Sequence, residues 1–205
     1  KILTCSTAYA WYDHNYIEVL QTNATGQSTI KDGVQSARKV LHKIRTKEVI
    51  LATGAHERPM LFETNDLANI MLSQSVRRYL NEFNVIGGKE VVLYGNNDSI
   101  YSTAIDLNNH KISCKVVDVR APGNESEVVI QVKNLGILVL QGFAVIKAKG
   151  ASRVNGVEIS SVDNQAKPPQ WKSKWRLAGD TQTLNCDLLA TSGGFNPVVH
   201  LDCHC

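Results

Sequence analysis

The sequence lacks several features that would place it in a particular class of protein. No apolar run approaches the roughly 18 residues that a membrane-spanning helix needs. Its Lys and Arg residues are scattered and leave a net charge of only +3, which argues against a nucleic-acid or membrane-surface protein. No Cys-x-x-Cys pair occurs, which argues against the dithiol chemistry of disulfide reductases.

The five cysteines do not form a disulfide framework or a metal motif. Their number is odd and most lie in strand-like apolar runs, which is typical of reduced thiols and predicts a cytoplasmic protein. The last few residues include His200, Cys203, His204 and Cys205, but their spacing is cramped and no second pair lies upstream, so we predict no metal site.

Both ends of the sequence indicate a fragment. The chain opens without Met in a β-type run and closes a few residues after a glycine turn, which in a wound sheet would lead into another helix. With 205 residues, 43% of them hydrophobic, it is long enough for one large or two small domains.

Residues 49–59 are the stretch around which the chain is organised. The apolar residues 49–52 followed by Thr53-Gly54 predict a short buried strand that ends where the backbone turns under a ligand. Arg58 could then clamp a phosphate or a carboxylate. A second copy of the pattern, residues 188–197, contains Gly193 and Gly194. An ordinary core strand followed by a loop is the alternative interpretation.

The remaining periodicities predict an α/β fold of Rossmann type with an antiparallel meander. Three strands are expected first, at residues 2–10, 16–21 and 37–47, and two helices follow at residues 65–71 and 73–83. A β-α-β unit comes next, with strands at residues 90–94 and 111–119 and a helix at residues 99–109 between them. A helix at residues 125–135 and strands at residues 137–140 and 143–148 follow, and Asn155-Gly156 predicts the turn of a hairpin. Trp171, Trp175 and Leu177 are expected to cover an edge. A last strand, at residues 185–191, is expected to return to the first sheet. Ser73 is expected to cap its helix.

The turn of the β-α-β unit departs from the glycine fingerprint of dinucleotide sites. Counted from Gly95, the second and third glycine positions of G-x-G-x-x-G are occupied by Asn97 and Ile100. Asp118 stands where a ribose-binding acid would. The turn residues Gly95, Asn96, Asn97, Asp98 and Ser99, with Asp118, are therefore either a degenerate structural unit or a weaker nucleotide site.

Five segments together resemble the alpha subunits of heterotetrameric sarcosine oxidases: Tyr12-Asp13-His14-Asn15-Tyr16, Ala52-Thr53-Gly54-Ala55-His56-Glu57-Arg58-Pro59, residues 71–80, Asn96-Asn97-Asp98-Ser99 and Ser192-Gly193-Gly194-Phe195-Asn196-Pro197. The resemblance implies a two-dinucleotide-binding-domain flavoprotein. Residues 1–64 with 181–205 would be part of the first domain, and residues 65–180 an inserted second domain.

The resemblance also implies function. The complete enzyme oxidatively demethylates sarcosine to glycine, uses FAD and FMN, and carries NAD on the alpha subunit, while sarcosine is oxidised on another subunit. No catalytic residue is therefore expected here, and the fragment alone should be inactive. The predicted cofactor contacts are Ala8, Tyr9, Thr53, Gly54, Ala55, Arg58, Gly193 and Gly194. A ligand-free scaffold for partner subunits, or a subunit of a related FAD-dependent amine or opine dehydrogenase, remain alternatives.

Overall fold

The computed structural model describes residues 2–22, 30–31, 34–35, 39–123, 125–163, 176–177 and 179–204. The chain forms two compact units, one of Lys1–Ala55 with Pro197–Cys205 and one of His56–Asn196. The domain boundaries predicted at residues 64/65 and 180/181 lie inside the second unit, and the domain division of a complete subunit stays a prediction. No helix in the described ranges is long and apolar enough to cross a membrane.

The first unit is an antiparallel meander, as predicted. Strands β1 (Ser6–Tyr12), β2 (Tyr16–Thr22) and β5 (Lys39–Arg45) pair in that order. His14 and Asn15, both at positive φ, turn the chain between β1 and β2, as the hairpin requires. The unit also contains the two-stranded sheet β3 (Ile30–Lys31) with β4 (Val34–Gln35), and the 3-10 helix η1 (Asp202–His204).

The strand predicted over residues 49–52 does not form. Residues 46–54 have no regular secondary structure, and Ile50 is 89% exposed. An apolar run becomes a strand only where neighbouring backbone pairs with it, and no strand pairs with residues 49–53 among the described residues. A short strand follows instead: β6 (Ala55–Glu57) pairs with β16 (Phe195–Pro197), where the chain passes between the two units.

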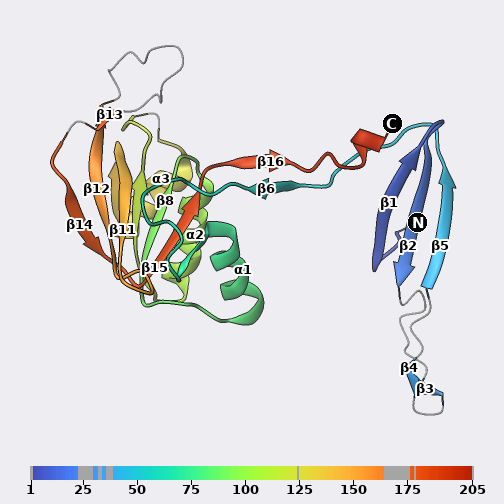
Figure 1. Cartoon of the computed structure of the whole chain (residues 1–205), viewed down its shortest axis with the longest axis horizontal. Coiled ribbons are helices and arrows are strands. Elements are labelled where there is room, and N and C mark those ends of the chain that lie inside the picture. The colour runs from blue at the N-terminus through green and yellow to red at the C-terminus, as the bar shows by residue number, and fades with distance from the viewer. Residues whose placement is uncertain are drawn as a thin grey trace. The chain divides into compact units, whose positions relative to one another are not determined.

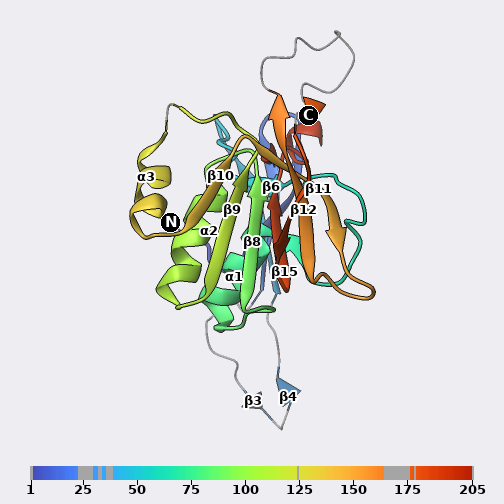
Figure 2. The ribbon, with the colours of Figure 1, turned by 90° about the vertical axis from the view of Figure 1, so that its left-hand side faces the viewer.

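The second unit has three layers (Figure 1). Its centre is a parallel sheet in the order β10-β9-β8-β15-β7, which Figure 2 shows nearly face on. These strands are β7 (Ile70–Leu72), β8 (Glu90–Gly95), β9 (Ser113–Asp118), β10 (Leu138–Gln141) and β15 (Leu188–Ser192). Helices α1 (Ser73–Phe83), α2 (Ser99–Asn109) and α3 (Glu127–Asn134) cover one face. The other face packs on a second sheet, formed by β11 (Phe143–Lys149), β12 (Gly156–Asp163), β13 (Arg176–Leu177) and β14 (Gln182–Asn185).

Successive residues of β8 supply the cores on both sides of the parallel sheet. Val91 and Leu93 pack in the cluster formed with the helices, whereas Val92 and Tyr94 pack in the cluster formed with the antiparallel sheet. All four are at most 2% exposed. A strand buried on both faces reads as a continuous apolar run, which is why the β-α-β unit at residues 90–119 was predicted correctly.

Four further local predictions were wrong. Residues 65–71 do not form a helix, because residues 70–72 pair with β15 in the parallel sheet. Ser73 does not cap α1, since its hydroxyl is buried against Thr103. Asn155-Gly156 does not turn a hairpin of its own but ends the loop between β11 and β12.

The fourth error concerns residues 185–191. They form most of β15, which lies between β7 and β8 in the second unit rather than in a sheet of the first. Pairing partners of a parallel strand are distant in sequence, so the apolar run alone could not identify its sheet. The edge predicted for Trp171 and Trp175 lies outside the described residues, and Leu177, in β13, is exposed.

Glu57 caps α1 from outside the helix. Its Oε2 accepts the backbone N–H of Gln74 at 2.8 Å, so a carboxylate occupies the positive end of the helix. Its Oε1 is buried and makes no hydrogen bond within the described part of the chain. Burial raises the pKa of Glu57 above its ordinary value, although Ser192 and the Gln74 N–H both favour the charged form, because that form is poorly solvated there.

This raised pKa predicts a pH-dependent cost of Glu57. Folded Glu57 holds its proton to higher pH than unfolded Glu57, so stability is lost as pH rises from the unfolded pKa to the folded pKa. The free energy of unfolding of the wild type, relative to Glu57→Gln, should therefore fall as the pH rises above the ordinary pKa of a glutamate. Urea unfolding at several pH values measures it, with Glu82→Gln on the exposed side of α1 as the control. A wild-type free energy of unfolding that rises with pH relative to that of Glu57→Gln would contradict the prediction.

Asp187 holds the start of β8. Its carboxylate accepts the N–H of Lys89 at 2.8 and 2.9 Å and the N–H of Glu90 at 2.8 Å. A Cβ at Gly88 would clash with Asp187 Oδ1 and lie 2.7 Å from Leu188 Cβ. The carboxylate can therefore approach these amides only because residue 88 is glycine.

Removing this carboxylate should destabilise the second unit. We expect Asp187→Ala to lower the free energy of unfolding by about 2 kcal/mol, because two amides at the start of β8 lose charge-assisted hydrogen bonds. Asp66→Ala, at an exposed aspartate, should change it by less than about 0.5 kcal/mol. Equal effects of the two substitutions in denaturant unfolding would show that the bonds to residue 187 do not stabilise the sheet.

Candidate functional site

The carboxyl edge of the parallel sheet is the place where a Rossmann-type fold offers a ligand site. The chain continues from β8 through α2 to β9 on one side, and β15 lies on the other side of β8. The strand order therefore reverses between β8 and β15, and a crevice is expected at their carboxyl ends. Gly95 ends β8 and Ser192 ends β15, directly opposite each other.

Side chains of the protein itself fill this switch point. Asn97 Nδ2 donates to the Ser192 carbonyl at 3.2 Å and lies 3.0 Å from Ser192 Oγ. Asn97 Oδ1 accepts the Ser99 hydroxyl at 2.6 Å and the Ser99 N–H at 3.1 Å. Asn96 N–H also reaches the Ser192 carbonyl, at 3.3 Å. The predicted turn residues are thus brought together, but their hydrogen-bonding groups are engaged with one another and with Ser192.

Gly95 is required by packing at this point. A Cβ on Gly95 would lie 2.6 Å from the Ser192 carbonyl oxygen and 2.8 Å from Ile100 Cγ2. No side chain is accommodated at such distances without a shift of the backbone. The remaining glycine of the fingerprint therefore has a structural reason that needs no ligand.

Asp118 lies where the sequence predicts, at the end of β9, but its oxygens are occupied. It is fully buried and accepts the Tyr101 hydroxyl at 2.7 Å and the Arg120 guanidinium at 2.7 to 3.1 Å. Arg120 also pairs with Asp98 at 2.7 Å. Burial alone would raise the pKa of Asp98, yet bonds from Ser126 and Arg120 hold it below its ordinary value. Asp118 and Asp98 are therefore joined through one arginine.

Sequence reasoning missed the partners that occupy this edge. Arg120, Tyr101 and Ser192 each bond directly to a residue predicted for the site. The spacing Asp118-x-Arg120 at a strand end was a usable signal for the ion pair. No comparable signal pointed to Ser192, because it reaches Asn97 only after β15 has joined β8.

The Gly54 turn belongs to the first unit. Gly54 has φ +77° and no described atom lies within 4 Å of its Cβ position. Its carbonyl accepts the N–H of Val198 at 3.0 Å, and the Thr53 hydroxyl donates to the Val198 carbonyl. Residue 198 therefore holds an exposed left-handed turn in place. The neighbouring prediction, Ala55, lies in β6.

The predicted adenine contacts lie in β1 of the same unit. Ala8 and Tyr9 are both exposed, and β1 is an edge strand of its sheet. The register with β2 shifts between Ala8 and Ala10, so a bulge breaks the ladder at this point. Tyr9 donates its hydroxyl to Glu18 at 2.8 Å.

The other three predicted contacts are brought together in the second unit. Arg58 N–H donates to the Gly194 carbonyl at 2.8 Å, and Gly193 N–H donates to the Arg58 carbonyl at 2.6 Å. The Arg58 guanidinium donates to the Gly193 carbonyl at 3.2 Å. A Cβ on Gly193 would lie 2.8 Å from the Pro59 carbonyl oxygen, so this glycine permits the close approach of two backbone segments.

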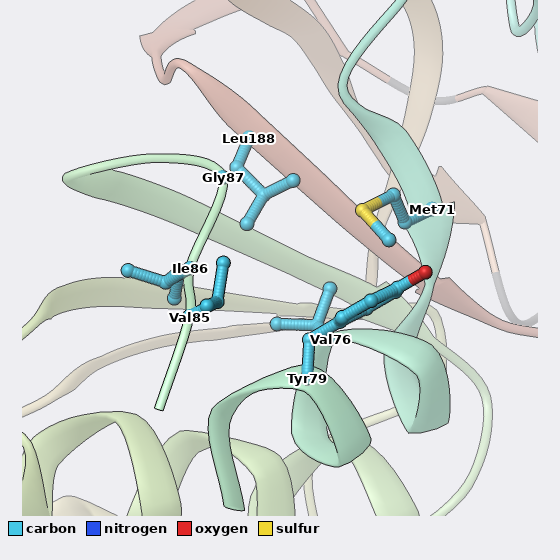
Figure 3. A pocket seen from close by; sticks show the side chains of 7 residues that line it. All are labelled: Met71, Val76, Tyr79, Val85, Ile86, Gly87 and Leu188. Atoms are coloured by element: carbon cyan, nitrogen blue, oxygen red, sulfur yellow. The ribbon is translucent and has the colours of Figure 1, made fainter. Parts of the chain in front are cut away.

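An apolar pocket of about 190 Å³ lies beside α1, between β7 and the loop after the helix. Figure 3 shows Met71, Val76 and Leu188 pointing into it, with the Tyr79 ring at its side. No charged side chain is among the described residues that line it. It offers burial for an apolar group but no group for catalysis or for binding a phosphate.

Comparison with known proteins agrees with the predicted family and fold. No family model matches the chain. It is 37% identical over 198 residues to "Sarcosine oxidase subunit alpha" of Corynebacterium sp. (strain U-96) and 33% identical over 198 residues to that of strain P-1, in each case over 96% of this chain and 19% of the relative. Among solved structures, thioredoxin reductase of Lactococcus lactis superposes with a TM-score of 0.59 at 15% identity, over 96% of this chain and 55% of that one.

The structural likeness shows the fold alone, and the sequence relatives show the family. The superposition over 96% of the chain agrees with the two-dinucleotide-binding-domain fold predicted for it. Over nearly its whole length the chain is therefore related to the sarcosine oxidase alpha subunit, of which it spans 19%, and it has the fold of the two-dinucleotide-binding flavoproteins.

Proposed function

We propose that this chain is the dinucleotide-binding region of a sarcosine oxidase-like alpha subunit and that NAD binds at the Gly54 turn. The complete complex would contain FAD and FMN and demethylate sarcosine oxidatively to glycine, with the other subunits of a heterotetramer as partners. The chain itself would bind nucleotide and contribute no catalytic residue. The family relationship and the geometry of the Gly54 turn support this proposal.

The observation that carries the proposal is the exposed left-handed turn at residue 54. With φ +77° and an open Cβ position, Gly54 lets a ligand approach its backbone N–H with no side chain in the way, as a pyrophosphate requires. Val198 fixes the turn, so little conformational entropy would be lost on binding. Thr53 and Ala55 flank the turn, and the bulge at Ala8 and Tyr9 leaves backbone groups of an edge strand for the adenine.

The second unit is better explained as a scaffold. Asn97 and Ser192 close the switch point, and Arg120 occupies both Asp98 and Asp118. A dinucleotide would have to break these bonds before binding. The alternative of a non-catalytic Rossmann scaffold is thereby favoured for this unit. A subunit of a related FAD-dependent amine or opine dehydrogenase remains the other alternative.

A cytoplasmic location is part of the proposal. Cys5, Cys114, Cys186 and Cys203 are all free thiols, and burial raises the pKa of Cys114 to about 11 and that of Cys186 to about 12. Such thiols stay protonated and unreactive. Reduced cysteines of this kind are typical of a reducing compartment.

The Gly54 assignment predicts loss of nucleotide on Gly54→Val in the complete alpha subunit. A β-branched side chain at this φ costs about 1 to 3 kcal/mol and would stand where the pyrophosphate approaches. Gly136→Val is a matched control, because Gly136 has φ +75° and an equally open Cβ position in the exposed turn after α3. Nucleotide content after gel filtration should fall at least about ten-fold only for Gly54→Val. Equal retention by both variants would refute the assignment.

The scaffold assignment predicts that substitutions at the switch point of the second unit lower stability but leave the nucleotide content unchanged. Gly95→Val should lower the free energy of unfolding by about 2 kcal/mol or more, because of the contacts with Ser192 and Ile100. Asn97→Ala should lower it by about 1 to 3 kcal/mol. The folded fraction of each variant should keep its nucleotide. If Asn97→Ala is folded and free of nucleotide, the site lies in the second unit.

A further inference from the structure

A second cavity lies in the second unit, between the parallel and the antiparallel sheets. Its volume is about 650 Å³, which is within the range of small-molecule sites. Met60, Leu61, Val145 and Leu177 contribute apolar walls, and Leu61 and Leu177 are 83% and 54% exposed. Among the described residues that line it, two have side chains with polar groups, Arg58 and Tyr94. Both come from segments already described, one after β6 and one in β8.

Arg58 brings a positive charge to this cavity. Its guanidinium donates one hydrogen bond, to the Gly193 carbonyl. It forms no ion pair with a carboxylate in the described part of the chain. None of the described residues that line the cavity is acidic. Because a guanidinium has five N–H donors, most of them remain for a ligand.

Tyr94 places a second donor in the cavity. Its side chain is 2% exposed, with the ring 6.0 Å from that of Phe62. Burial raises its pKa to about 12, and a hydrogen bond from the Val145 backbone partly opposes that rise. The Tyr94 O–H makes no hydrogen bond of its own within the described residues, so it can donate to a ligand.

We infer that this cavity binds a small organic carboxylate with an apolar body. The planar guanidinium of Arg58 matches a carboxylate in bidentate geometry. The Tyr94 hydroxyl supplies one neutral donor, and the apolar walls bury the rest of the ligand. A phosphate dianion would leave charge uncompensated beside a single cation in this apolar setting. Arg58 is thereby assigned to a ligand other than the nucleotide for which the sequence predicted it.

The test is binding of 3-phenylpropionate to the full chain, compared with its neutral analogue 3-phenylpropanamide. Calorimetric titration should show the carboxylate binding at least about ten-fold more tightly, because only the carboxylate pairs with the guanidinium. Arg58→Gln, which keeps a donor for the Gly193 carbonyl, should reduce the preference to less than about three-fold. Arg153→Gln, at an exposed arginine outside the cavity, should leave it unchanged.

Three results would overturn the inference: equal binding of acid and amide, an unchanged preference in Arg58→Gln, or an equal loss in Arg153→Gln. Tyr94→Phe keeps the ring and should weaken the carboxylate about three- to ten-fold. The carboxylate proposal and the nucleotide proposal are tested independently, because Gly54→Val should keep carboxylate binding and Arg58→Gln should keep the nucleotide content. Thermal unfolding of each variant establishes that the folded protein was titrated.

Discussion

The contact between the ends of β8 and β15 is the constraint on which the second unit depends. Gly95 lies so close to the Ser192 carbonyl that no Cβ fits between them, and Asn97 ties the following turn to the same residue. Two strands separated by about a hundred positions in sequence are thereby held in register at the edge where a nucleotide would otherwise enter. Buried polar groups of this kind stabilise a fold only when they are satisfied together.

This arrangement separates two roles that a Rossmann-type unit usually combines. The apolar alternation of β8 builds a three-layer core, while the polar turn that follows closes the crevice instead of cradling a phosphate. Arg120, shared between Asp98 and Asp118, acts in the same way at the end of β9. The carboxylates that could have accepted hydrogen bonds from a ribose are both engaged with Arg120. The polar groups at this edge therefore have partners within the protein.

The hydrogen-bond donors that we propose for ligands lie away from this edge of the sheet. The Gly54 turn presents a backbone N–H, and the cavity beside Arg58 and Tyr94 presents a phenol and a guanidinium that pairs with no carboxylate among the described residues. These two places differ in chemistry. A backbone turn suits the spread charge of a pyrophosphate, whereas a single guanidinium above apolar walls suits one small anionic group. The proposed nucleotide and the proposed carboxylate therefore require different residues.

The sequence by itself determined the β-α-β unit, the first meander and the family, because each depends on local signals. Residues 90–119 show a doubly buried strand, a helix and a second strand, and the turn between the first two lacks two of three glycines. Only the tertiary structure decided that residues 49–52 form no strand, that β15 joins the second unit, and that Asn97 meets Ser192. The physical reason is the same in each case: a strand or a buried polar group is defined by its partner, and these partners are distant in sequence.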